Sequence, residues 1–253
     1  MRRPLVMGNW KMNGSLLANQ ALIAALEETA TKCSDIDVAV CPPFIYLPQV
    51  VGLCTTNRIH VGAQNISDQE KGAFTGEVSG EMLRDLDVGF VLVGHSERRA
   101  IYGETNEIVA SKVNKALEKG LIPVLCVGET LAQRQSGEMN TVIEAQVLAV
   151  LESASIQAFA QVVIAYEPVW AIGTGETATP EQAQEVHAFI RGLLAQHDSS
   201  IAARTTILYG GSVNASNADQ LFAMPDVDGG LVGGASLKAA DFSEICRAAQ
   251  ASL

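Results

Sequence analysis

Residues 162–175 read VVIAYEPVWAIGTG, and the interpretation of the whole chain depends on this stretch. Its first residues are a continuous run rich in Val, Ile and Ala, which is typical of a strand buried on both faces. Glu167 ends the run, and a loop follows that opens with Pro168 and closes with glycines. The pattern predicts a buried strand that carries a carboxylate beneath a loop able to act as a lid. It fits equally well a glutamate that is only the first solvated residue after a strand.

Similar apolar runs alternate with helical patterns along the rest of the sequence. We expect further strands near residues 5–8, 38–41, 60–63, 90–94, 123–127, 205–209 and 229–232. Thr179, Pro180 and Gln182 form a capping-box pattern that marks the start of the helix after the sixth strand. No linker or shift in composition interrupts the alternation. Eight β/α repeats in 253 residues favour one domain, residues 1–253, folded as a closed (β/α)₈ barrel rather than an open doubly wound sheet.

The composition narrows the choice of partners and location. A net charge of −11 argues against nucleic acid or an anionic membrane as the main partner. Backbone dipoles can still hold a small anion on an acidic protein. The sequence contains no apolar run of 18 residues, so we expect no membrane span. The five cysteines are scattered and form no CxxC pair, which favours reduced thiols and a cytoplasmic protein.

Two motif matches are set aside, and we expect neither a metal nor a cofactor. Residues 95–97 match the H-x-E of zinc deaminases, but the P-C-x-x-C of those enzymes does not follow. Residues 173–178 match a dinucleotide-binding pattern, but the helix begins only after the motif, at Pro180.

Polar side chains follow the predicted strands, at the end of a barrel where active sites lie. Asn9 and Lys11 follow the first strand, His95 and Glu97 follow the fourth, and Glu167 follows the sixth. Each has an ordinary explanation: a single histidine beside a strand is more often structural, and the charged residues could be surface groups. Their convergence on one barrel mouth favours a site with a base and a proton donor.

Paired glycines follow the seventh and eighth strands, in Gly210-Gly211-Ser212 and Gly233-Gly234. Glycines permit close approach of the backbone, and successive N–H groups can bind a phosphate. The loops after strands seven and eight are also the recurrent phosphate site of (β/α)₈ barrels. Either pair alone would more often be a turn.

Several segments resemble the triosephosphate isomerase family in order and spacing, over the whole chain. They are GNWKMNG (8–14), GHSERR (94–99), YEPVWAIGTG (166–175), YGGSV (209–213) and LVGGASL (231–237). The resemblance implies interconversion of dihydroxyacetone phosphate and D-glyceraldehyde 3-phosphate through an enediol(ate), in glycolysis and gluconeogenesis, without a cofactor. The substrate would be a small phosphorylated triose.

The resemblance also implies roles for individual residues. Glu167 would be the base, neutral His95 the electrophile, Lys11 and Asn9 would stabilise the enediolate and the phosphate, and Glu97 would support Lys11. The phosphate would bind to the backbone of four residues, which are Gly173, Ser212, Gly233 and Gly234. Glu176 departs from the family pattern, because a lysine is expected there at the end of the lid.

The long loop around Phe74, Thr75 and Gly76 resembles the family's dimer loop and predicts a homodimer. Two alternatives remain at this stage. One is another phosphate-binding barrel enzyme, against which the GNWK, GHSERR and YEPVWAIGTG segments argue. The other is an inactive barrel kept as an interaction protein, which should have lost Lys11, His95 or Glu167.

Overall fold

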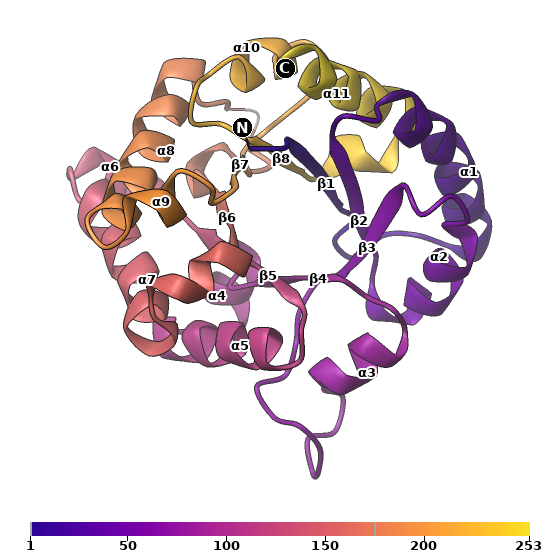
Figure 1. Cartoon of the computed structure of the whole chain (residues 1–253), viewed down its shortest axis with the longest axis horizontal. Helices are drawn as coiled ribbons and strands as arrows, with labels where there is room; N and C mark the ends of the chain where they lie inside the picture. The colour runs from indigo at the N-terminus through magenta and orange to yellow at the C-terminus, as the bar shows by residue number, and fades with distance from the viewer. Residues whose placement is uncertain (1, 175) are drawn as a thin grey trace.

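The computed structural model describes residues 2–174 and 176–253. Within them, parallel strands form a closed barrel in which each strand pairs with the next and β8 pairs with β1 (Figure 1). The strands are β1 (Leu5–Asn9), β2 (Asp37–Cys41), β3 (Ile59–Ala63), β4 (Phe90–Val93), β5 (Ile122–Val127), β6 (Val163–Tyr166), β7 (Ile207–Tyr209) and β8 (Gly229–Val232). The predicted closed (β/α)₈ barrel is confirmed.

Helices surround the barrel (Figure 1). They are α1 (Leu16–Lys32), α2 (Leu47–Leu53), α3 (Gly80–Asp85), α4 (Ser96–Tyr102), α5 (Asn106–Glu118), α6 (Leu131–Gln135), α7 (Met139–Ala154), α8 (Pro180–Ala195), α9 (Ser199–Ala202), α10 (Ala218–Phe222) and α11 (Ala239–Ala251). Short 3₁₀ turns are η1 (Phe44–Tyr46), η2 (Ile156–Gln161), η3 (Val169–Ala171) and η4 (Gly234–Leu237). The capping box at the start of α8 is confirmed, since Thr179 and Gln182 each accept a hydrogen bond from the other's backbone N–H.

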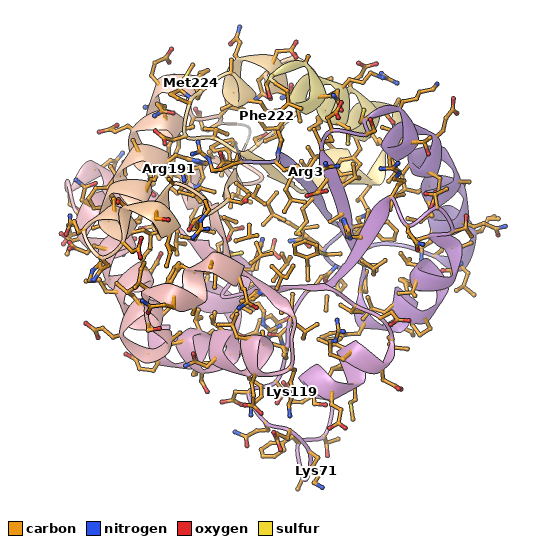
Figure 2. All side chains as sticks on the ribbon, in the orientation of Figure 1. Arg3, Lys71, Lys119, Arg191, Phe222 and Met224 are labelled. Carbon is orange, nitrogen blue, oxygen red and sulfur yellow. The ribbon has the colours of Figure 1, made fainter. Side chains whose placement is uncertain are left out.

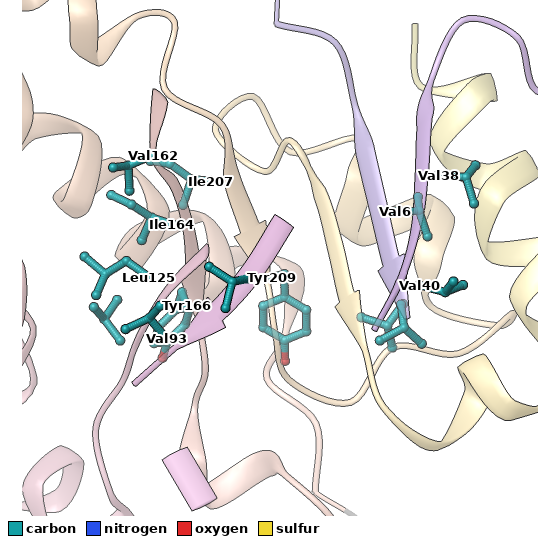
Figure 3. Packing of buried hydrophobic residues seen from close by; sticks show 14 of the residues in the cluster. Val6, Val38, Val40, Val93, Leu125, Val162, Ile164, Tyr166, Ile207 and Tyr209 are labelled. Carbon is teal, nitrogen blue, oxygen red and sulfur yellow. The ribbon is translucent and has the colours of Figure 1, made fainter. Parts of the chain in front are cut away.

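Alternate side chains of the strands enter two separate cores. Val6, Ile164 and Tyr166 belong to the larger cluster, which packs the barrel against its helices (Figure 3). Met7 and Ala165 belong to the smaller cluster, which fills the barrel interior. Because successive side chains of a strand point to opposite faces, Glu167 falls on the same side as Ala165. The alternation along β6 therefore aims Glu167 into the barrel mouth.

The loop of residues 64–79 projects from the barrel between β3 and α3 (Figures 1 and 2). Lys71 lies near its far end (Figure 2). The loop contains no helix or strand, as the sequence predicted.

Candidate active site

A pocket of about 350 Å³ opens at the carboxyl ends of the strands. Nearly all the residues predicted for the site line it, namely Asn9, Lys11, His95, Glu167, Gly173, Ser212, Gly233 and Gly234. Glu97 does not line this pocket but a neighbouring cleft, which it shares with Asn9, Lys11 and His95. The barrel thus brings together residues more than 200 positions apart in the sequence.

Glu167 is buried, with 2% of its surface exposed, and both of its carboxylate oxygens have partners. Oε1 lies 2.8 Å from Nε2 of His95, and Oε2 accepts a hydrogen bond of 2.9 Å from the backbone N–H of Ser96. Gly210 leaves room for this side chain, because a Cβ there would lie 2.9 Å from Glu167 Cγ. The carboxylate is held at the edge of the pocket and must give up these partners to reach a ligand.

His95 is the N-cap of α4, and its ring is oriented by the backbone of that helix. The N–H of Glu97 donates to Nδ1 of His95 at 3.2 Å. Burial lowers the pKa of His95, while the carboxylates of Glu167 and Glu97 raise it, and the net shift is upward. A proton on Nδ1 would break the hydrogen bond from Glu97 N. The geometry therefore assigns the ring proton to Nε2, the atom that faces Glu167, with the imidazole neutral.

Lys11 is held in an unusual backbone conformation by polar contacts on both sides. Its φ is 51°, in the left-handed region that side-chain-bearing residues rarely occupy. Its N–H donates to Oδ1 of Asn9 at 3.0 Å, and its carbonyl accepts from Nε2 of Gln64 at 2.8 Å. The Lys11 ammonium lies 2.8 Å from Oε1 of Glu97. These contacts place a cation at the pocket, with Glu97 against it.

Gln64 is a site residue that sequence reasoning missed. It also donates to the carbonyl of Cys41, and so ties the ends of β1 and β2 together beside the pocket. It is the first residue after β3. Asn9 and Glu167 were selected as polar residues at strand ends, and the same criterion applied to β3 would have selected Gln64.

The glycine-rich turn after β8 lies close to Lys11. A Cβ at Gly233 would lie 3.6 Å from Lys11 Cε, while a Cβ at Gly234 would meet no atom within 4 Å. Ser236 holds the turn, because its N–H and its hydroxyl both donate to the Gly233 carbonyl. The pocket therefore joins a cation to backbone that no side chain covers, which suits a phosphate.

A second missed residue, Glu129, anchors the start of the loop after Pro168 that was predicted to act as a lid. It is fully buried, and its Oε1 accepts from the hydroxyl of Tyr166, the indole N–H of Trp170 and the guanidinium of Arg134, at 3.1, 2.8 and 3.1 Å. Its carbonyl accepts from the N–H of Val169. Glu129 lies just after β5, so it too follows a strand end.

Residues close together in sequence hold the far end of this loop. Thr174 donates from its hydroxyl to the carbonyl of Trp170, and the N–H of Glu176 donates to that hydroxyl. Gly173 takes a φ of 68°, which glycine adopts without strain. Glu176 is exposed. Gly175, the last residue of the predicted lid, lies outside the described residues.

Cys126 is a reactive group near the pocket, but it is packed among apolar side chains. Cys126 is fully buried in the barrel interior, and burial together with the Glu167 carboxylate raises the pKa of its thiol well above the ordinary value. A neutral buried thiol contributes packing. Across residues 2–174 and 176–253, no group of three or more His, Cys, Asp or Glu side chains is arranged to hold a metal ion.

Comparison with known proteins agrees with this geometry. The family model described as triosephosphate isomerase matches residues 4–249. The triosephosphate isomerase of Nitrosomonas eutropha is 55% identical over 249 residues, which cover 98% of this chain and 99% of the relative. That of Thiobacillus denitrificans is 56% identical, with the same coverage. That of Cupriavidus necator is 55% identical over 97% of this chain and 99% of the relative. The chain belongs to the triosephosphate isomerase family.

Proposed function

We propose that Glu167, His95 and Lys11 carry out the reaction of this family, the interconversion of dihydroxyacetone phosphate and D-glyceraldehyde 3-phosphate. The enzyme is an aldose–ketose isomerase of glycolysis and gluconeogenesis, and membership of the family establishes this activity. The observation that supports the residue roles is the arrangement of the pocket. A carboxylate lies 2.8 Å from an imidazole, in a pocket that is also lined by a lysine and by the glycines that follow β7 and β8.

Each group has a distinct task in the proposed mechanism. The Glu167 carboxylate removes a proton from the carbon next to the carbonyl and returns it to the neighbouring carbon. His95 donates from Nε2 to the oxygens on which negative charge develops. Lys11 and Asn9 stabilise that charge, and the backbone of Gly173, Ser212, Gly233 and Gly234 binds the phosphate. Preorganised donors of this kind act most strongly in a pocket from which water is excluded.

The contacts of Glu167 connect this chemistry to the lid. Glu167 is followed directly by Pro168 and η3, whose first residue is fastened to Glu129. A shift of the lid would carry Glu167 away from Ser96 and toward the pocket, and would also exclude water. One segment would then couple closure to the placing of the base.

The experiment that tests the proposal is turnover of D-glyceraldehyde 3-phosphate by the purified chain, followed in deuterium oxide. Proton transfer through an enediol(ate) should place solvent deuterium on the carbon that receives the proton. Isomerisation without deuterium uptake at any substrate concentration would argue against a base that exchanges its proton with solvent.

Replacing Lys11 with methionine is expected to weaken binding of phosphate-bearing inhibitors about 10- to 100-fold. A hydrogen bond to a charged group contributes roughly 1.5–3 kcal/mol, and the variant loses one to the phosphate or the enediolate. Inhibition constants with inorganic phosphate and a phosphorylated substrate analogue measure the effect. Lys32→Met, at the exposed C-terminal end of α1, is the matched control and should bind like the wild type. Equal affinity in the Lys11 variant would show that its charge is unnecessary.

We also propose a homodimer formed through the loop around Phe74, Thr75 and Gly76. The loop projects from the barrel (Figure 2). Phe74 on this loop is 45% exposed. A cleft of about 250 Å³ beside the active site could receive the same loop of a second copy, and its lining includes Met12, Phe44, Glu97, Arg98 and Tyr102. Met12 and Tyr102 are 95% and 67% exposed, so a partner would cover apolar surface.

The dimer is tested by sedimentation velocity at the concentrations used for activity assays. We expect twice the mass of one chain, and Phe74→Asp should lower both the dimer fraction and the specific activity. A monomeric wild-type chain with full activity would contradict the proposal.

We also propose that residues 1–253 work as one barrel domain and that the protein is cytoplasmic. It rests on the role of the family in glycolysis and on the scattered cysteines. No helix among the described residues is long and apolar enough to cross a bilayer. Fractionation of the source cells would test the location.

A further inference from the structure

We infer that Lys238, at the rim of the pocket, is a steering residue that draws the substrate dianion in and is partly masked by Asp241. Lys238 and Asp241 both line the pocket, and the mechanism above uses neither. Lys238 directly follows η4, the turn that begins at Gly234, and it is the N-cap of α11. A phosphate bound at Gly233 and Gly234 would therefore lie close to this lysine.

The overall charge of the protein makes a cation at this rim useful. The chain carries a net charge of −11, so the molecule as a whole repels a dianion. Solvent ions screen charges beyond about 8 Å at 0.15 M ionic strength, which leaves the charges at the pocket mouth to decide the approach of the substrate. Lys11 and Lys238 are the lysines that line the pocket within the described residues. Lys11 already pairs with Glu97 at 2.8 Å.

The contacts of Lys238 leave it free to meet a ligand. Its side chain is 75% exposed, and among the described residues the carboxylate oxygen nearest to its ammonium is Oδ2 of Asp241, 3.8 Å away. This separation exceeds hydrogen-bond length, and an exposed pair of this kind is weakly held. Lys238 can therefore turn toward an incoming phosphate, while Asp241 reduces the positive potential that the phosphate meets.

Lys32 and Glu28 form an exposed ion pair remote from the pocket, which serves as a control for the pair of Lys238 and Asp241. Lys32 and Glu28 lie in the last turns of α1, at the opposite end of the barrel, and form an exposed ion pair of 2.6 Å. Their exposed fractions, 69% and 72%, are similar to that of Lys238. Substitutions there change the net charge by the same amount without changing the charge at the pocket mouth.

The experiment measures kcat and KM of four variants between 10 mM and 300 mM ionic strength. At the low end, Lys238→Ala should lower kcat/KM about threefold to fivefold through KM, with kcat unchanged, and the loss should nearly vanish at the high end. Asp241→Asn should raise kcat/KM about twofold at the low end, by the same reasoning. Lys32→Ala and Glu28→Gln should change kcat/KM much less than the variants at the pocket mouth at every ionic strength, because they lie far from the path of the substrate into the pocket.

The steering role rests on the proposed function, because it requires a phosphorylated substrate. The experiment distinguishes a failure of the proposed function from a failure of the steering role. Wild-type turnover of the triose phosphate tests the function by itself. If the wild type is active, a salt-independent effect, an effect on kcat, or equal losses in Lys238→Ala and Lys32→Ala would overturn the steering role. Turnover of glyceraldehyde, which is neutral, should be the same in the wild type and in Lys238→Ala. A loss with this substrate would also overturn it.

Discussion

Replacing Glu167 with aspartate is expected to lower kcat about 100-fold, with KM nearly unchanged. The substitution keeps the carboxylate and shortens the side chain by one methylene, which retracts the base by about 1 Å, and a misplacement of that size can cost about 100-fold in rate. Glu167 has to leave His95 and Ser96 to act, so its reach into the pocket is what the shorter side chain loses. Lys11 and the glycines would still bind the phosphate, which explains the small effect expected on KM.

The measurement is steady-state kinetics in both directions of the reaction. Glu185→Asp, the same change at an exposed position of α8, is the matched control and should turn over like the wild type. Circular dichroism should show both variants folded. A Glu167→Asp variant with wild-type kcat would remove Glu167 from the role of base.

Replacing His95 with asparagine is expected to lower kcat by about 100- to 1000-fold, the usual cost of losing one donor to a developing oxyanion. The imidazole is held by the N–H of Glu97 so that Nε2 carries the proton toward the pocket. Asparagine has an amide donor but is too short to place it where Nε2 lies. The substrate phosphate keeps its contacts, so the loss should appear mainly in kcat.

His60→Asn provides the control, because His60 is an exposed histidine on β3 that does not line the pocket. It should leave kcat unchanged. The role of His95 as electrophile would be refuted by a loss smaller than tenfold, or by a similar loss in the control.

Local patterns in the sequence were sufficient to predict the strand ends that build this site. The apolar run before Glu167 indicated β6, and the positions of Asn9 and His95 followed from the same rule. The capping box at Thr179 was predictable because the contacts it makes lie within four residues. The short helices α4, α6, α9 and α10 were not predicted, since helices of one or two turns carry too little periodicity to be recognised.

Gln64 and Glu129 show that the choice of site residues from the sequence was too narrow. Both follow strands, but neither lies in a segment quoted for the family resemblance. Gln64 supports the Lys11 backbone, and Glu129 fastens the start of the lid, so both act through other residues. A rule that looks for reactive groups overlooks residues whose task is to hold them.

The sequence alone determined the barrel, the family and the presence of a carboxylate at the end of β6. Those properties depend on the apolar runs and on the motif spacing, which can be read along the chain. The closed tertiary structure decided that Glu167 lies against His95 and the N–H of Ser96, 71 residues earlier in the chain. It also decided that Lys11 takes a left-handed conformation between Asn9 and Gln64, and that Lys238 reaches the same pocket. Apart from the bond between Asn9 and Lys11, these contacts join residues far apart in the chain, so they exist only once the strands have paired and their ends share one mouth.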